Sequence, residues 1–129
     1  MADRYERMLR AMRVDLTLAY AQLALVCHRM PIPVDLPTHE DIDFQDDMTP
    51  AVRRLVEIAD DLPVDEDTKA GVFMTAIDWL TAVDLWTLLA STGQNTVREM
   101  CFTGALVRVR ELLAELLQDG DAEYGTDQE

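Results

Sequence analysis

Two residues of this sequence could act as bases near neutral pH, His28 and His39, and a nucleophile stands beside one of them. Cys27 precedes His28 in a segment with helical periodicity. Adjacent positions on a helix point in different directions, so Cys27 and His28 do not form a nucleophile–base pair by themselves. We expect Cys27 to be packed as a small apolar residue and His28 to lie at a helix end, near the negative pole of the helix dipole.

The second candidate for chemistry is a run of carboxylates in the segment 31–48. Asp41, Asp43, Asp46 and Asp47 have a spacing that faintly resembles a calcium-binding loop. The segment lacks the central glycine and the glutamate at the twelfth position that an EF-hand requires. The residues therefore favour a solvated acidic loop that could contact an arginine-rich partner. Ile42 and Phe44 are its best anchors to the body of the protein.

Other arrangements with known chemistry are missing from the sequence. It has no Glu-x-x-His pair, no glycine-rich phosphate loop and no C-x-x-C pair. We expect a chain that is not an enzyme and that binds no metal or cofactor. Cys27 and Cys101 are interpreted as apolar core residues in a reducing cytoplasm, and residues 1–13 do not resemble a signal peptide.

Composition limits the partners. The 129 residues fit one domain, 49% of them are apolar, and the formal net charge is -14 with a pI near 4.3. Such a charge repels nucleic acid and anionic membranes, so we expect neither as a partner, and it suits a basic protein. Lys69 is the only lysine. A GC-rich genome and selection against ubiquitin-acceptor lysines both explain that bias.

Apolar periodicity and helix-boundary residues predict four helices within a domain of residues 1–118. The first covers residues 4–30 and ends at Pro31. The second covers residues 49–62, with Thr49 as N-cap and Pro50 in its first turn. The third covers residues 66–92, before Gly93, and the fourth covers residues 95–118, where Gly104 leaves open an unbroken helix, a bend or a split into two shorter helices. Residues 31–48 form the acidic loop, and residues 119–129 are expected to be a disordered acidic tail.

The third helix differs from the others because it is apolar in nearly every direction around its axis. Such a helix is either buried on all sides or spans a membrane, and Asp78 and Asp84 argue against the membrane. We therefore predict an all-α compact bundle with a central third helix, whose core residues are Phe73, Ile77, Trp79, Leu80, Val83 and Trp86. The alternative is an up-down four-helix bundle.

Asp78 and Asp84 allow two interpretations. If the two carboxylates are buried, they need cationic partners, and the fourth helix offers Arg98, Arg108 or Arg110. Each carboxylate could instead lie at a small exposed window on the surface of the third helix.

Residues 68–110 resemble a known family. The segment "TKAGVFMTAIDWLTAVDLW", followed by "STGQNTVREMCFTGALVRVRELL", is similar to the central and following helices of the small poxviral Bcl-2-like immune modulators. Phe73, Thr75 and Trp86 match the F-x-T and the late tryptophan of that family. The turn after the helix, residues 92–96, lacks the N-W-G-R of the wider Bcl-2 pattern, which argues against death-ligand binding. The resemblance thus implies a Bcl-2-like fold and the branch that blocks innate immune signalling.

The resemblance also implies an interface, because that branch often forms homodimers through its first and sixth helices. Carried onto this chain, the partner or dimer surface would include Arg10, Arg13, Arg98 and Phe102. The leading hypothesis is a non-enzymatic viral inhibitor of host innate immune (NF-κB-type) or apoptotic signalling, acting in the host cytoplasm. The alternative is an acidic phage or prokaryotic inhibitor that mimics nucleic acid and blocks a basic target protein.

Overall fold

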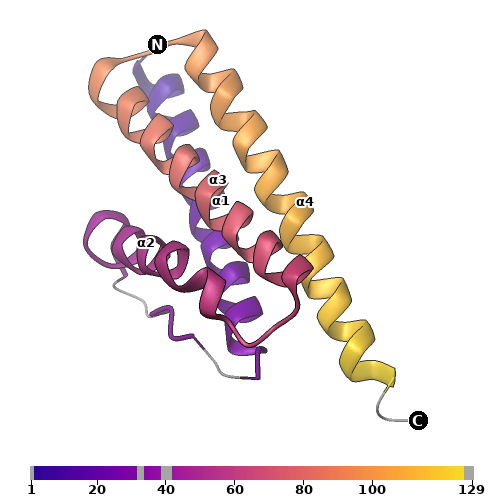
Figure 1. Ribbon diagram of the computed structural model, residues 1–129. Helices are drawn as coiled ribbons and strands as arrows, with labels where there is room; N and C mark the ends of the chain where they lie inside the picture. The colour runs from indigo at the N-terminus through magenta and orange to yellow at the C-terminus, as the bar shows by residue number, and fades with distance from the viewer. Residues whose placement is uncertain (1, 32–33, 39–41, 127–129) are drawn as a thin grey trace.

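The computed structural model describes residues 2–31, 34–38 and 42–126, and the side chains of residues 4–118 within those ranges. Its main helices are α1 (Ala2–His28), α2 (Thr49–Ile58), α3 (Glu66–Thr92) and α4 (Thr96–Thr126) (Figure 1). A π-helical turn, η1 (Phe44–Met48), precedes α2, and a 3-10 turn, η2 (Ala59–Asp61), follows it. No strand occurs in the described residues. The predicted all-α compact bundle is confirmed.

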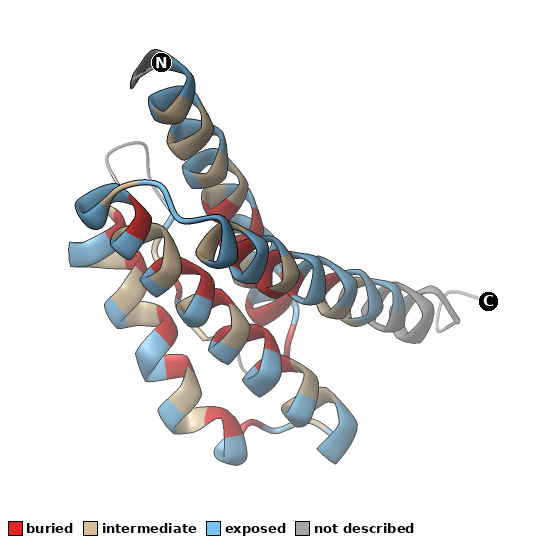
Figure 2. Ribbon diagram, turned by 90° about the horizontal axis from the view of Figure 1, so that it is seen from above, coloured by how far each residue is buried: buried red, intermediate tan, exposed pale blue. Residues whose placement is uncertain are grey.

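Three long helices run side by side, and the short α2 closes one flank of the bundle (Figure 1). α1 and α3 are antiparallel, and α4 returns along α3 after a tight turn. Among the described residues, α3 packs against α1, α2 and α4. The buried side chains lie on the faces that the helices turn toward one another (Figure 2).

Local interactions set both ends of α3, and Gly93 is the stop that the sequence indicated. The Asp65 carboxylate accepts the Thr68 backbone N–H at 2.8 Å, which caps the first turn. Gly93 has a φ of 95°, a conformation that favours glycine, and its N–H donates to the Leu89 carbonyl. Asn95 then caps α4 by accepting the Arg98 backbone N–H at 3.0 Å. The tight turn between α3 and α4 follows from these local interactions.

The start of α2 differs from the prediction. Asp43 caps η1 instead, because its carboxylate accepts the backbone N–H groups of Gln45 and Asp46, which also lowers the pKa of Asp43. η1 continues directly into α2, so Thr49 is already helical and cannot act as N-cap. Its Oγ1 is buried without a hydrogen-bond partner. The predicted Thr49 cap is therefore wrong.

The C-terminal ends of α1, α2 and α4 also differ from the prediction. α1 ends at His28 rather than at residue 30, and the regular α-helix of α2 ends at Ile58, before the 3-10 turn. α4 passes Gly104 without a break, because the burial of Phe102, Ala105 and Leu106 around it outweighs a glycine cost of about 1 kcal/mol. α4 also continues to Thr126, through most of the predicted disordered tail. Residues 127–129 of that tail and residues 39–41 of the acidic loop lie outside the described residues.

Two tryptophans of α3 hold it to α1. Trp79 is fully buried and donates its indole N–H to the Leu16 carbonyl at 2.9 Å. One heptad further along, Trp86 donates to the Leu9 carbonyl at 2.8 Å. The Tyr5 hydroxyl completes the row by donating to the Leu89 carbonyl at 2.6 Å. Because the three bonds follow one another along the interface, they fix the antiparallel register of α1 and α3.

Phe44 anchors the acidic loop, as the sequence indicated. Its ring is buried and packs edge-on against Trp86 and Trp79, at centroid distances of 5.7 and 6.2 Å. Ile42 is partly buried beside the same core. Farther back in the segment, the Pro37 carbonyl accepts the Tyr20 hydroxyl at 2.7 Å. The described part of the acidic segment is therefore packed against the body at both of its ends.

α3 is packed against the other three helices, as predicted, but two of its six predicted core residues are exposed. Trp79 and Val83 are buried, and Leu80 and Trp86 are half-buried, but Phe73 and Ile77 are exposed. The reason is geometric, since α1, α2 and α4 cover three sides of α3 and no described element covers the fourth. α3 is also the one described helix that is long and apolar enough to cross a membrane, a test that core helices pass as well.

The buried indole gives a direct test of this core. Trp79→Ala should lower the free energy of unfolding by about 3–5 kcal/mol, because it leaves a cavity and removes the bond to Leu16. Urea titration followed by circular dichroism measures the change. Leu88→Ala, at an exposed position of the same helix, is the control and should change the value by only about 0.5 kcal/mol. Equal effects of the two substitutions would contradict the burial of this side of α3.

Candidate protein-binding surface

The structure separates the four residues that the resemblance assigned to an interface. Phe102 is only 2% exposed and belongs to the core, so its assignment to a surface is wrong. It lies on the side of α4 that packs into the bundle, together with Ala105 and Leu106. Arg10 is exposed, as expected. Arg98 is half-buried and donates to the Thr92 hydroxyl at 2.9 Å, at the turn between α3 and α4.

Arg13 is exposed but also part of the packing. Its guanidinium lies 5.2 Å from the centre of the Phe44 ring, a distance at which a cation is attracted to an aromatic face. The side chain therefore joins α1 to η1. Of the four predicted interface residues, the two on α1, Arg10 and Arg13, are exposed. The two on α4 are less accessible, since Arg98 is half-buried and Phe102 is buried.

The outer side of α1 carries an apolar stripe that the sequence reading missed. Val14, Leu18 and Leu25 are 56%, 59% and 42% exposed, although they are large apolar side chains. Exposed alanines continue the row, so that the stripe consists of Ala11, Val14, Leu18, Ala21 and Leu25. The spacing alternates between three and four residues, which is the a/d pattern of a coiled-coil seam. We call these five residues the α1 stripe.

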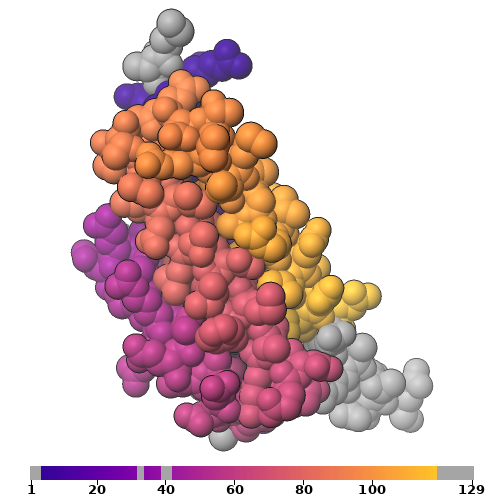
Figure 3. Space-filling model, turned by 45° about the horizontal axis from the view of Figure 1, so that its top comes forward, coloured from indigo at the N-terminus to yellow at the C-terminus, as the bar shows by residue number. Residues whose placement is uncertain are grey.

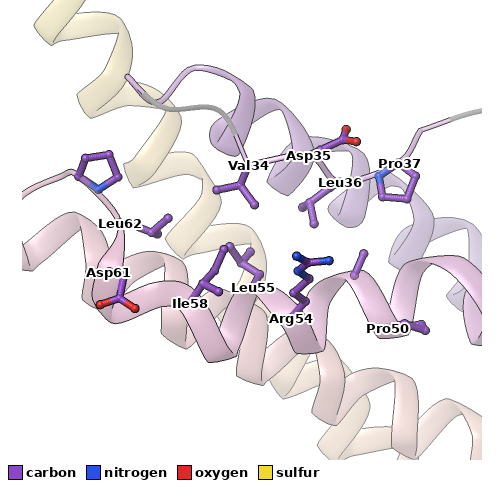
Figure 4. Close-up of a pocket in the computed structure, with 12 residues that line it drawn as sticks. Val34, Asp35, Leu36, Pro37, Pro50, Arg54, Leu55, Ile58, Asp61 and Leu62 are labelled. Atoms are coloured by element: carbon purple, nitrogen blue, oxygen red, sulfur yellow. The ribbon is translucent and has the colours of Figure 1, made fainter.

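A hollow continues the α1 stripe at its C-terminal end. It is lined by Ala21, Leu25 and His28 of α1 and by the returning chain at Val34 and Leu36. The same returning chain forms one wall of a groove against α2 (Figure 4). Leu55, Ile58 and Leu62 line the other wall of that groove, and the Arg54 side chain points from that wall toward Leu36. Apolar surface thus extends from the middle of α1 toward α2.

The charge around the α1 stripe differs from that of the chain as a whole. Four of the eleven cationic residues lie in the first half of α1: Arg4, Arg7, Arg10 and Arg13. Arg7 and Arg10 precede the stripe by about one turn on the same side of the helix. Asp15, at the edge of the stripe, is paired with Arg110 of α4 at 3.3 Å. The N-terminal end of the stripe is therefore cationic in a protein of net charge -14.

The residues first considered for chemistry are not brought together. Within the described part of the chain, no group of three or more His, Cys, Asp or Glu side chains could hold a metal ion. Cys27 is buried, and burial raises the pKa of its thiol to about 12. Its neighbour His28 is exposed at the end of α1, as expected. His39 lies outside the described residues.

The two carboxylates of α3 differ, because Asp78 has a cationic partner whereas Asp84 is exposed. Asp78 is half-buried and accepts a charge-assisted hydrogen bond from Arg108 of α4 at 3.4 Å. Asp84 is exposed to solvent. Arg108 was one of the three predicted partners, whereas Arg98 and Arg110 have the other contacts described above.

Comparison with known proteins finds no match to this chain among protein families, curated proteins or solved structures. The resemblance to the poxviral Bcl-2-like proteins therefore remains a prediction that rests on the quoted residues alone.

The two cysteines should differ sharply in reactivity. Cys101 is exposed, which corrects its predicted place in the core, whereas Cys27 is buried and has a raised pKa. At about pH 8, Ellman's reagent should therefore modify Cys101 rapidly in the native protein and Cys27 only after denaturation. Cys101→Ser should abolish the rapid phase. Rapid modification of both thiols in the wild type would contradict the burial of the Cys27 side chain in the core.

Proposed function

We propose that this chain is a non-enzymatic protein-binding module that docks a helix of its partner on the α1 stripe. The observation that carries the proposal is the exposed heptad row Ala11, Val14, Leu18, Ala21 and Leu25. Isolated apolar residues on a protein surface are ordinary, but a row at coiled-coil spacing is a continuous surface that a second helix can cover.

The dimensions of the α1 stripe fit one helix of ordinary length. The stripe covers residues 11–25, about 21 Å at the rise of an α-helix, which is roughly four turns. Small and large side chains are mixed along it, with alanine at two positions and Val14, Leu18 and Leu25 at the others. Side chains of a facing helix can pack beside the alanines of such a surface. The larger side chains of the α1 stripe can in turn insert between the side chains of the facing helix.

The charge around the α1 stripe specifies the partner further. Because Arg7 and Arg10 flank its N-terminal end, a partner helix with an apolar seam and acidic flanking residues is favoured. A homodimer of the kind that the resemblance implies would use this stripe instead of Phe102, which is buried. Two α1 helices would then meet at the least acidic part of each chain.

The biological role of the chain is inferred from the resemblance to the poxviral Bcl-2-like proteins. We infer a viral Bcl-2-like inhibitor of host innate immune (NF-κB-type) or apoptotic signalling that acts in the host cytoplasm. Two observations support this inference. Residues 68–110 resemble the central and following helices of that family, and α3 packs against each of the other helices of an all-α bundle.

A reporter assay tests both parts of the proposal. Expression of the wild-type chain in stimulated human cells should lower the output of an NF-κB reporter or protect the cells from induced apoptosis. Leu18→Glu should abolish the effect, because a carboxylate in the middle of the α1 stripe would be buried without a partner. Met100→Glu, on the exposed side of α4, is the matched control and should retain it.

The outcomes separate the binding surface from the identity of the partner. Both variants should keep the helical signal and the urea midpoint of the wild type, because both positions are solvent-exposed. Equal activity of the wild type and Leu18→Glu would exclude the α1 stripe as the docking surface. A wild-type chain without any effect in either assay would contradict the inferred viral function.

A further inference from the structure

The fourth side of α3 is apolar although it faces solvent. Phe73, Met74 and Ile77 are 42%, 51% and 39% exposed. Figure 3 shows α3 along this side of the molecule, between α2 and α4. The opposite side of α3, with Val72, is fully buried. Phe73, Met74 and Ile77 lie within two turns of one another and form the surface that we call the α3 patch.

The α3 patch has the composition of a binding surface. Phe and Met are enriched in the centres of protein interfaces, and the unbranched Met side chain adapts to different partners. Three large side chains next to one another are also unlike the scattered apolar residues of an ordinary surface. The α3 patch is on the opposite side of the molecule from the α1 stripe, because α1 and α3 bury the faces that they turn toward each other.

Exposed carboxylates lie on α3 both before and after the α3 patch. Glu66 and Asp67 are exposed in the first turn of α3, and Asp84 is exposed about two turns beyond Ile77. Asp60 and Asp61 are exposed on η2, which packs against α3. Two cations also lie near this part of α3, where Lys69 pairs with Glu66 and Arg108 of α4 pairs with Asp78. The two ion pairs leave Asp67 and Asp84 of α3 as exposed carboxylates, so the surroundings of the α3 patch along the helix are acidic.

We propose that the α3 patch binds a basic amphipathic helix of another protein. The apolar side of that helix would cover Phe73, Met74 and Ile77, and its lysines or arginines would pair with Asp67 and Asp84. A second copy of this chain fits poorly, because the carboxylates of two α3 helices would face each other. This inference is independent of the α1 stripe, with which it shares no residue.

Binding of a synthetic helix tests the inference. The probe is a fluorescein-labelled peptide of about 18 residues, roughly 27 Å of helix, with leucine on one side and lysine on the other. Its matched control replaces every lysine with glutamate. Fluorescence anisotropy should show binding of the lysine peptide only, and the affinity should fall with rising salt.

Two variants separate the α3 patch from the general acidity of the chain. Ile77→Ser should weaken binding of the lysine peptide by about tenfold or more, because it removes an apolar contact and leaves every charge in place. Met100→Ser, at an exposed apolar position on α4, should change the affinity less than about twofold. Circular dichroism and urea midpoints confirm that both variants fold.

Three results would overturn the inference. Equal affinities of the wild type and Ile77→Ser would show that charge alone holds the peptide. Binding of the glutamate peptide with similar affinity would show that the carboxylates of α3 do not select the partner. Self-association of the wild type, or its binding to phosphatidylcholine vesicles, that Ile77→Ser abolishes would assign the α3 patch to a second copy or to a lipid surface.

Discussion

The arrangement of this protein depends on the hydrogen bonds that two indole groups of α3 make to the backbone of α1. Trp79 and Trp86 lie seven residues apart, and the carbonyls that they reach, Leu16 and Leu9, lie seven residues apart in the opposite direction. An alignment that took the Leu16 carbonyl away from Trp79 without a replacement would leave a buried indole N–H unpaired, which costs about 1–3 kcal/mol. The apolar surfaces drive α1 and α3 together, and the indoles select one alignment.

This alignment determines which surfaces remain outside. With α1 fixed against α3, Phe44 packs edge-on between the same two tryptophans, and Arg13 covers the Phe44 ring. η1 and α2 are thereby placed on one flank of α3, while α4 occupies the other. The outer sides of α1 and α3 are what these contacts leave uncovered. Both proposed binding surfaces are therefore consequences of a single packing arrangement.

The sequence predicted those features that depend on local chemistry. Pro50 and Gly93 act at helix ends within a few residues, and the structure places both as expected. Phe73, Ile77 and Phe102 could not be assigned in the same way, because their exposure depends on which neighbours cover α3 and α4. α1 has apolar rows on two sides, and the longer row, with Leu16, Leu23 and Val26, is the one that faces the core.

The Thr49 cap was wrongly predicted for a related reason, because no local pattern indicates that a π-helical turn continues into α2 and places this residue inside a helix. The α1 stripe did have a detectable signal. Its spacing alternates between three and four residues from Ala11 to Leu25, alongside the longer row that faces the core. Two apolar rows on one helix indicate two contacts, and the second contact need not lie within the same chain.

The strong negative charge of the chain has a further consequence for these two uncovered apolar sides. Copies of the protein repel one another near neutral pH, which opposes indiscriminate contact between exposed apolar surfaces. That repulsion is weakest near the isoelectric pH of about 4.3, and it is screened by salt at every pH. Colloidal stability of the unliganded protein thus depends on its surface carboxylates, including those that carry no structural interaction.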